Sequence, residues 1–194
     1  MIAIVNSGGA NLASVIFAIQ RLERPYIFTA DPDVISKASH VILPGVGAAG
    51  MAMKTLNDSE LVECLRKLTQ PVIGICLGMQ LLFEHSEEGD VDLLKLLPAR
   101  VKKFPDSDLP VPHMGWNRLE IIQPNPLLKD MESNPYVYFV HSYYAPVGDY
   151  TAALTNYSTP FSSVVNRDNI FGCQFHPERS GKPGARILKN FVEL

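Results

Sequence analysis

The sequence has no long apolar run, few cysteines and no excess of basic residues. Its 194 residues include 17 Lys and Arg, 20 Asp and Glu and 3 Cys, with a formal net charge of −3. A transmembrane helix needs about 20 consecutive apolar residues, and no stretch approaches that length. The start of the chain has neither the basic segment nor the cleavage site of a secretory signal. We therefore expect a soluble, cytoplasmic protein.

The same scarcities argue against nucleic-acid binding and against a disulfide framework. Lys and Arg are scattered along the chain, so they form no basic footprint for DNA or RNA. Three cysteines are an odd number without paired spacing, which favours a reducing compartment. The length is most simply that of one domain, and no repeat, linker or low-complexity segment divides it. No metal site and no cofactor is assigned from the sequence.

A short apolar run ends at a cysteine that lies between two glycines. Residues 72–75 predict a buried strand, and residues 77–84 predict a helix that begins immediately afterwards. Cys76 therefore lies at a sharp strand-to-helix turn, flanked by Gly74 and Gly78 in the pattern typical of the nucleophile turn of hydrolases. The N–H groups and the dipole at the start of a helix stabilise an anion, which favours a thiolate. Cys76 is the predicted nucleophile.

The rest of the first half alternates predicted strands with helices. Strands are predicted at 2–5, 26–29 and 40–43, and helical segments at 12–22, 31–33 and 51–68. The second half consists of short extended runs separated by Pro, Asn, Asp and Gly, followed by a last helix. The extended runs are 99–103, 118–122, 136–140, 151–154, 162–166 and 170–175, and the helix is 183–192. We expect an α/β fold with a mixed, largely parallel open sheet, flanking helices and a strand-rich, partly antiparallel second half.

Two glycine-rich loops follow predicted strands. Residues 44–50 would lie at the carboxyl edge of the sheet, where ligands bind in open α/β folds. Taken alone this loop also fits a flexible connector. Beside the predicted nucleophile turn, the loop is better interpreted as part of an oxyanion hole, because acyl transfer needs hydrogen-bond donors from different segments. Residues 7–11 lack the glycine spacing and the lysine of phosphate-binding loops, so a tight turn is the simpler interpretation.

A cysteine nucleophile needs a base, and His176 is the strongest candidate. Strand alternation places Cys173 on the opposite face, so Cys173 is not expected to react. The same extended geometry places Glu178 on the side of His176, where its carboxylate can receive the imidazole N–H. His141 also ends an apolar strand and remains a rival base, although no carboxylate follows two residues later. The remaining histidines are interpreted as surface or structural residues: His40, His85 and His113.

Three ordered signatures resemble those of the class I, or triad-type, glutamine amidotransferases: Pro44–Gly47, Gly74–Gln80 and Phe175–Glu178. Further motifs make the chain similar to the glutaminase subunit of imidazole glycerol phosphate synthase in histidine biosynthesis. These motifs are Pro112–Asn117, Tyr138–Tyr143 and Asn11–Val15, in a chain without a fused synthetase. The resemblance extends from Met1 to the last helix, so a single glutamine amidotransferase type 1 domain is expected over residues 1–194.

This resemblance implies hydrolysis of glutamine to glutamate and ammonia by a triad. The implied catalytic residues are Cys76, His176 and Glu178. The implied oxyanion donors are the backbone N–H groups of Gly47 and Leu77. The implied glutamine-binding residues are Gly45, Gln80, Ser142 and Tyr143.

The resemblance also implies a protein partner. The family passes its ammonia through a (β/α)8-barrel synthase subunit that makes imidazole glycerol phosphate and AICAR. A heterodimer is therefore expected, with Asn11, Trp116 and Arg179 at the interface. Arg179 stands where relatives commonly have lysine, and the turn at residues 6–11 departs from their usual Asp-Tyr-Gly-x-Gly-Asn. We also expect the partner to raise the glutaminase rate, with a flipped loop at Val46–Gly47 gating the free subunit.

Three other interpretations stay open. A stand-alone cysteine hydrolase or peptidase fits the same scaffold, although Gln80 and residues 141–143 favour free glutamine. A catalytically silent binding subunit is disfavoured because every triad member is present. The same glutaminase chemistry also fits a paralogous synthase outside histidine biosynthesis, because the acceptor would bind on the partner.

Overall fold

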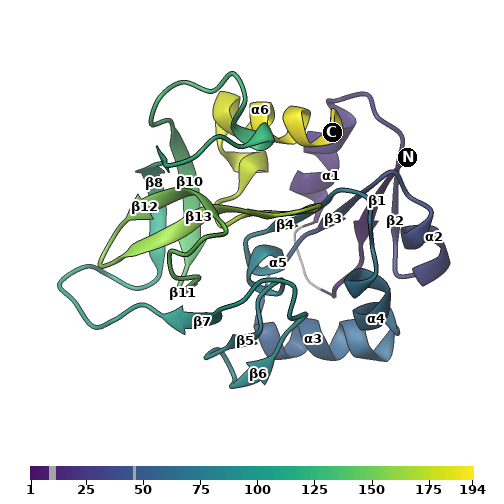
Figure 1. Ribbon diagram of the computed structural model, residues 1–194, viewed down its shortest axis with the longest axis horizontal. Helices are drawn as coiled ribbons and strands as arrows, with labels where there is room; N and C mark the ends of the chain where they lie inside the picture. The colour runs from purple at the N-terminus through teal and green to yellow at the C-terminus, as the bar shows by residue number, and fades with distance from the viewer. Residues whose placement is uncertain (9–11, 46) are drawn as a thin grey trace.

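The computed structural model describes residues 1–8, 12–45 and 47–194, and its centre is an eight-stranded sheet with helices on both faces (Figure 1). The strand order is β2-β1-β3-β4-β14-β13-β12-β9. The first five strands in this order are mutually parallel: β2 (Tyr26–Thr29), β1 (Ile2–Val5), β3 (His40–Leu43), β4 (Val72–Ile75) and β14 (Ile170–Cys173). The other three extend the sheet in antiparallel fashion: β13 (Pro160–Arg167), β12 (Thr151–Asn156) and β9 (Glu120–Ile121). The predicted mixed, largely parallel sheet is confirmed.

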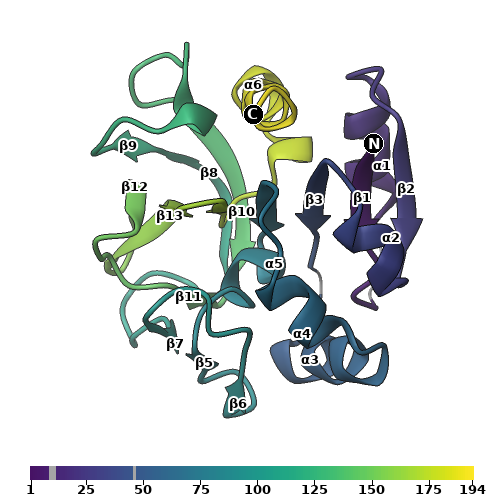
Figure 2. The same ribbon diagram turned by 45° about the vertical axis from the view of Figure 1, so that its right-hand side comes forward.

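Helices cover both faces of the parallel strands, which is why these strands are apolar at consecutive positions. In β1, Ile2 and Ile4 join one core cluster while Ala3 and Val5 join the other. The helices α1 (Ala13–Gln20) and α6 (Gly181–Val192) pack on one face, and α2 (Pro32–Ser36), α3 (Ala49–Asp58) and α4 (Leu61–Arg66) pack on the other (Figure 2). The two hydrophobic cores therefore fix the sheet from both sides.

Two of the predicted helices differ from those in the structure. The expected continuous helix over 51–68 is two helices, because Glu60 adopts a left-handed conformation with φ 56° between α3 and α4. The apolar residues over 61–68 do follow helical spacing, but hydrophobic periodicity gives no sign of a left-handed residue between two helices. The helix expected over 77–84 is also shorter, since α5 spans only Leu77–Gln80.

Two smaller sheets carry the remaining strands. One contains, in order, β11 (Tyr143–Tyr144), β7 (Arg100–Lys103), β5 (His85–Ser86) and β6 (Val91–Asp92). The other pairs β8 (His113–Arg118) with β10 (Tyr136–His141). Two short 3-10 helices complete the described structure: η1 (Pro126–Leu128) and η2 (Pro177–Arg179).

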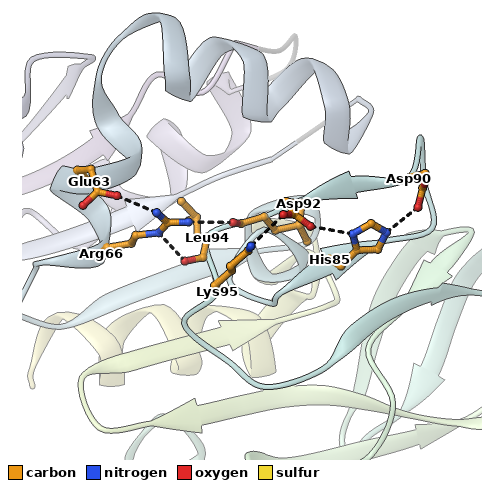
Figure 3. Close-up of polar contacts among 8 residues, drawn as sticks. Glu63, Arg66, His85, Asp90, Asp92, Leu94 and Lys95 are labelled. Atoms are coloured by element: carbon orange, nitrogen blue, oxygen red, sulfur yellow. Dashed lines mark hydrogen bonds and ion pairs between the residues drawn. The ribbon is translucent and has the colours of Figure 1, made fainter.

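Polar contacts tie the segment after the β5–β6 hairpin to helix α4 and stabilise the hairpin loop (Figure 3). The Nε of Arg66 donates to the carbonyl oxygen of Leu94 at 2.9 Å. The ring of His85 lies between Asp90, at 2.9 Å from Nε2, and Asp92, at 3.1 Å from Nδ1. These contacts fix the conformation of the hairpin and its place beside α4.

The three cysteines, Cys64, Cys76 and Cys173, form no disulfide. In the part of the chain that the structure describes, no helix is long and apolar enough to cross a bilayer. In the same residues, no group of His, Cys, Asp and Glu side chains is arranged to hold a metal ion.

Candidate active site

Cys76 occupies a strained turn at the end of β4. Its φ of 53° and ψ of −110° are rarely adopted by a residue with a side chain, and such a conformation costs on the order of 1–3 kcal/mol. The flanking glycines make the turn possible, because a Cβ at Gly74 would lie 2.5 Å from the carbonyl oxygen of Gly78. A Cβ at Gly78 would overlap the carbonyl oxygen of Leu43, and a Cβ at Gly45 would overlap the backbone N of Gly78. The predicted turn is therefore present, and its interlocking backbone supports it.

The second half of the chain brings His176 to the same edge of the sheet. Strands β4 and β14 are adjacent and parallel, with Ile75 opposite Cys173, and the N–H of Cys76 donates to the carbonyl oxygen of Cys173 at 2.8 Å. The carboxyl ends of parallel neighbours meet, so the residues after both strands share one edge. The N–H of His176 donates to the carbonyl oxygen of Tyr138 at 2.9 Å, which fixes its backbone as η2 begins.

Glu178 holds the imidazole of His176. The Nδ1 of His176 lies 2.8 Å from Oε1 of Glu178, and the two side chains are only 9% and 5% exposed. Burial by itself lowers the pKa of His176, but the interactions with Cys76 and Glu178, including their negative charge, outweigh burial and raise it to about 10. The imidazole is therefore protonated at neutral pH and is ready to donate a proton.

Replacing Glu178 with glutamine is expected to lower the pKa of His176 from about 10, because the amide can accept the Nδ1 proton but carries no charge. A raised pKa stabilises the fold fully below about pH 6.5, and this contribution disappears as the pH rises through about 10. The E178Q variant should therefore lose most stability near pH 6 and least near pH 10. NMR titration of the histidine ring and urea unfolding at several pH values would measure both effects. An unchanged titration of His176 would contradict the assigned cause.

A cavity of about 280 Å³ opens in front of Cys76. Of the predicted site residues, Gly47, Leu77, Gln80, Ser142 and Tyr143 line this cavity together with the cysteine. Gly45, His176 and Glu178 are not among the residues that line it. Gly45 is buried beneath the turn, against Leu77 and Gly78. A larger hollow of about 420 Å³ beside Asn117 and Asn156 contains no nucleophile. The chemistry of the lining therefore identifies the smaller cavity as the candidate site.

The residues of both predicted oxyanion donors, Gly47 and Leu77, line the cavity that contains Cys76. Leu77 is the first residue of α5, where an N–H group has no acceptor one turn earlier. Among the described residues, no backbone carbonyl accepts a hydrogen bond from the N–H of Leu77. Gly47 has φ 97°, a conformation that favours glycine, and its Cα faces open space. Val46, the other half of the predicted gate, lies outside the described residues.

Two polar residues of the site, Gln174 and Glu88, had no predicted role. Gln174 is fully buried, and its amide Nε2 lies 3.8 Å from the Sγ of Cys76 while its Oε1 accepts from Gln80 at 3.0 Å. Strand alternation placed Gln174 on the face of His176, which was the available signal. Glu88 lines the cavity, and its carboxylate accepts the N–H of Ala49 at 2.8 Å. No sequence signal pointed to Glu88, because it lies in a loop that only folding brings near.

The rival base His141 has both ring nitrogens occupied. Its Nδ1 lies 2.8 Å from the carbonyl oxygen of Tyr143, and its Nε2 lies 3.1 Å from Nδ1 of His113. Neither nitrogen is left to accept a proton from Cys76. The geometry therefore favours His176 as the base, and His113 is a buried structural residue rather than a surface one.

An exposed aromatic surface lies beside the triad, and we call it the β8–β10 strip. It consists of Met114, Trp116, Tyr136, Tyr138 and Arg179. Trp116 is 56% exposed, and the guanidinium of Arg179 lies 4.7 Å from the centre of the Tyr138 ring. The strip thus contains two of the three predicted interface residues. The third, Asn11, lies outside the described residues.

Comparison with known proteins identifies the class first. The family model described as glutamine amidotransferase class-I matches residues 12–194, so the chain belongs to the class-I glutamine amidotransferases. A solved glutamine amidotransferase superposes with a TM-score of 0.77 at 16% identity, covering 99% of this chain and 97% of that one. A glutamine amidotransferase from Thermotoga maritima gives a TM-score of 0.63 at 19% identity, covering 99% and 80%. At such low identity these two structures show the fold alone.

Closer relatives narrow the assignment. The imidazole glycerol phosphate synthase subunit HisH of Idiomarina loihiensis is 54% identical over 193 residues, which is 100% of this chain and 97% of that protein. The HisH subunit of Pasteurella multocida is 50% identical over 192 residues, covering 99% and 97%. The chain is therefore a member of the HisH family, and the resemblance inferred from its motifs is confirmed.

Proposed function

We propose that the chain is the glutaminase subunit of an imidazole glycerol phosphate synthase. It hydrolyses glutamine to glutamate and ammonia and passes the ammonia to a (β/α)8-barrel subunit. The observation that carries this proposal is the strained Cys76 at the same sheet edge as His176, which Glu178 holds at 2.8 Å. No cofactor takes part in this chemistry, and the cytoplasm is the compartment that suits a thiolate nucleophile.

Cys76 acts as the nucleophile and His176 as acid and then as base in the proposed reaction. The Cys76 thiolate attacks the side-chain amide carbon, and the electron pair of the C=O bond moves to oxygen. The N–H groups of Gly47 and Leu77 hold that oxyanion, and one such donor is typically worth about 10²–10³ in rate. His176 gives its proton to the nitrogen, so the C–N bond breaks and ammonia leaves a thioester. The neutral His176 then takes a proton from water, which attacks the thioester and releases glutamate and the thiolate.

The cavity lining suits a free amino acid. The carboxylate of Glu88 provides a negative charge that can pair with the α-ammonium of glutamine. Both N–H groups of Gln80 are used within the protein, by the carbonyl oxygen of Tyr143 at 2.8 Å and by Gln174 at 3.0 Å. The Oε1 of Gln80 is therefore the atom that accepts from the substrate. Ser142 contributes a hydroxyl that can donate to the α-carboxylate.

The β8–β10 strip is the proposed docking surface for the barrel subunit. Ammonia released into water near neutral pH is mostly protonated and no longer nucleophilic, so direct transfer requires a partner over the active site. Arg179 immediately follows Glu178, and the carbonyl of Tyr138 accepts the N–H of His176. A partner bound to this strip therefore contacts Arg179, which is the neighbour of Glu178 in the chain, and Tyr138, which is hydrogen-bonded to His176. This arrangement supports the expected rise in glutaminase rate on docking.

The proposal is tested by measuring glutamate production with and without the barrel subunit of the same organism. We expect the rate to rise when the partner and its ligand are added. In the W116A variant, the partner concentration that gives half of that rise should be about tenfold higher, as expected when an aromatic anchor that the partner would bury is removed. The matched control is F28A, which removes a 40% exposed aromatic side chain from the opposite edge strand, β2. Equal rates with and without the partner would favour a stand-alone hydrolase and contradict the proposal.

A further inference from the structure

Two histidines that the triad does not use face each other across the β8–β10 ladder. His113 and His141 are directly opposed residues of these antiparallel strands, and both are buried, at 3% and 6% exposure. The Nδ1 of His113 lies 3.1 Å from the Nε2 of His141. His141 also lines the cavity that contains Cys76. The pair therefore connects the interior of the small sheet to the wall of the candidate active site.

Aromatic rings enclose this pair and keep water from it. The ring of His113 stacks between Phe139, at a centroid distance of 4.8 Å, and Tyr157, at 4.1 Å. Phe161 packs edge-on against both imidazoles. Burial lowers the pKa of His113 to about 4. Burial is also the main reason why the pKa of His141 falls to about 3, with the nearby His113 and His176 contributing.

The contacts of the neutral pair allow only one arrangement of protons. The Nδ1 of His141 lies 2.8 Å from the carbonyl oxygen of Tyr143, so this nitrogen carries the hydrogen and donates. The Nε2 of His141 is then an acceptor, and the Nδ1 of His113 must donate to it. The Nε2 of His113 is in turn an acceptor and faces the amide Nδ2 of Asn117 at 3.3 Å. A hydrogen-bonded relay thus runs in one direction, from Asn117 to Tyr143.

The relay ends on an oxygen that also belongs to the substrate cavity. The carbonyl of Tyr143 accepts two hydrogen bonds, from His141 and from the Nε2 of Gln80, each at 2.8 Å. Gln80 donates its other N–H to Gln174, whose Nε2 lies 3.8 Å from the sulfur of Cys76. The position of Gln80, and with it the direction of its Oε1, therefore depends on where the Tyr143 carbonyl is held.

We propose that His113 and His141 are positioning residues for glutamine, because their one-directional relay holds the Tyr143 carbonyl where it orients Gln80 at the cavity wall. This inference rests on the proposed glutaminase function and adds two residues to it. Without the donor from His113, the Nε2 of His141 is a buried acceptor with no partner. The imidazole is then held only through its Nδ1 and turns away from the place where that nitrogen meets the Tyr143 carbonyl, so the carbonyl shifts and releases Gln80.

Two substitutions of His113 separate the relay from simple packing. The H113F variant keeps an aromatic ring between Phe139 and Tyr157 but removes the donor to His141. The H113N variant removes the ring but keeps a donor, because Nδ2 of asparagine occupies the place of Nδ1 of histidine. A packing role predicts that H113N is the more damaged protein in every measurement. The relay predicts that H113F is the variant with impaired glutamine binding, whatever its stability.

The probe is a diazo ketone analogue of glutamine, which alkylates Cys76 and reports both binding (KI) and attack (kinact). It is applied to the complex with the barrel subunit, because the free subunit is expected to be gated. We expect H113F to raise KI by about tenfold, the order expected from one misplaced buried hydrogen bond, with a change in kinact of about threefold or less. H113N should keep KI within about threefold of the unmodified protein. Its melting temperature should nevertheless be the lower of the two, because it loses the stacked ring.

The outcomes distinguish the relay from the proposed function. An unchanged KI in H113F, or a rise of KI that is larger in H113N than in H113F, would overturn the relay. The proposed function would still stand in that case if the unmodified protein showed saturable labelling. Labelling of the unmodified protein that neither saturates nor is blocked by glutamine would overturn the proposed function itself, and the relay with it. A rise confined to H113F supports both.

Discussion

Replacement of Cys76 by alanine is expected to reduce glutamine hydrolysis by about 10⁴-fold or more, the scale seen when a covalent nucleophile is removed. Without the sulfur no thioester forms, and the oxyanion donors and His176 have no adduct on which to act. Synthesis by the barrel subunit from added ammonium salt should remain unchanged, because that reaction bypasses this site. Glutamate production and ammonia-dependent synthesis, measured on the same complex, would check the two halves of this prediction.

Cys173 provides the matched control for the loss of a thiol. It lies opposite Ile75 on the neighbouring strand and is fully buried. Burial, with the charges of Glu178 and Cys76, raises the pKa of the Cys173 thiol well above its usual value, so it forms no thiolate. We expect C173A to keep glutaminase activity and to lose only stability, by about 1–2 kcal/mol for a small cavity. Activity that survived in C76A but not in C173A would reverse the assignment of the nucleophile.

The second large effect is expected on the fold. A single methyl group added at Gly78 would overlap the carbonyl oxygen of Leu43, in a region where strand β3, the loop after it and helix α5 are in backbone contact. Backbone atoms cannot move aside as a side-chain tip can, so relief requires displacement of a strand or of the turn. We expect G78A to lose about 3 kcal/mol or more in the free energy of unfolding. Urea unfolding followed by circular dichroism would measure this loss.

Gly50 is the control for the chemical change itself. It lies near the start of helix α3, and a Cβ there would meet nothing within 4 Å. Alanine is the better helix former by up to about 1 kcal/mol, so G50A should be neutral or slightly stabilising. A comparable loss of stability in both variants would show that close backbone approach at Gly78 is not the cause. A turn that tolerated G78A would also weaken the claim that glycine is required beside Cys76.

Local sequence patterns predicted helices and strands well where the whole helix or strand lies in a single environment, such as a strand that is buried on both faces. The buried parallel strands were found because short apolar runs bounded by turn residues are typical of strands covered on both faces. The break at Glu60 was missed, because a left-handed residue changes the direction of the chain without changing its hydrophobic period. The early end of α5 was also missed, because the apolar run continues through Phe83 after the helix has ended at Gln80. The turn at Cys76 was predicted because its glycines are neighbours of the cysteine in the chain.

Where two functional side chains lie close together in the sequence, their roles could be predicted from their spacing. The pairing of His176 with Glu178 follows from a two-residue spacing in extended chain, and the structure has it at 2.8 Å. Glu88 and the His113–His141 relay carried no such signal. Each depends on strands or loops that are separated by tens of residues and meet only through pairing register.

The sequence by itself determined the class of fold, the strained cysteine turn and the motifs that place the chain in its family, since all of these are encoded by residues close together along the chain. Only the tertiary structure decided which side chains share the cavity, that Gly45 supports the turn instead of lining the wall, and that His141 is committed to His113. The physical reason is that hydrogen-bond partners and cavity walls are set by the alignment of distant strands and by packing on both faces of the sheet, which no local pattern records.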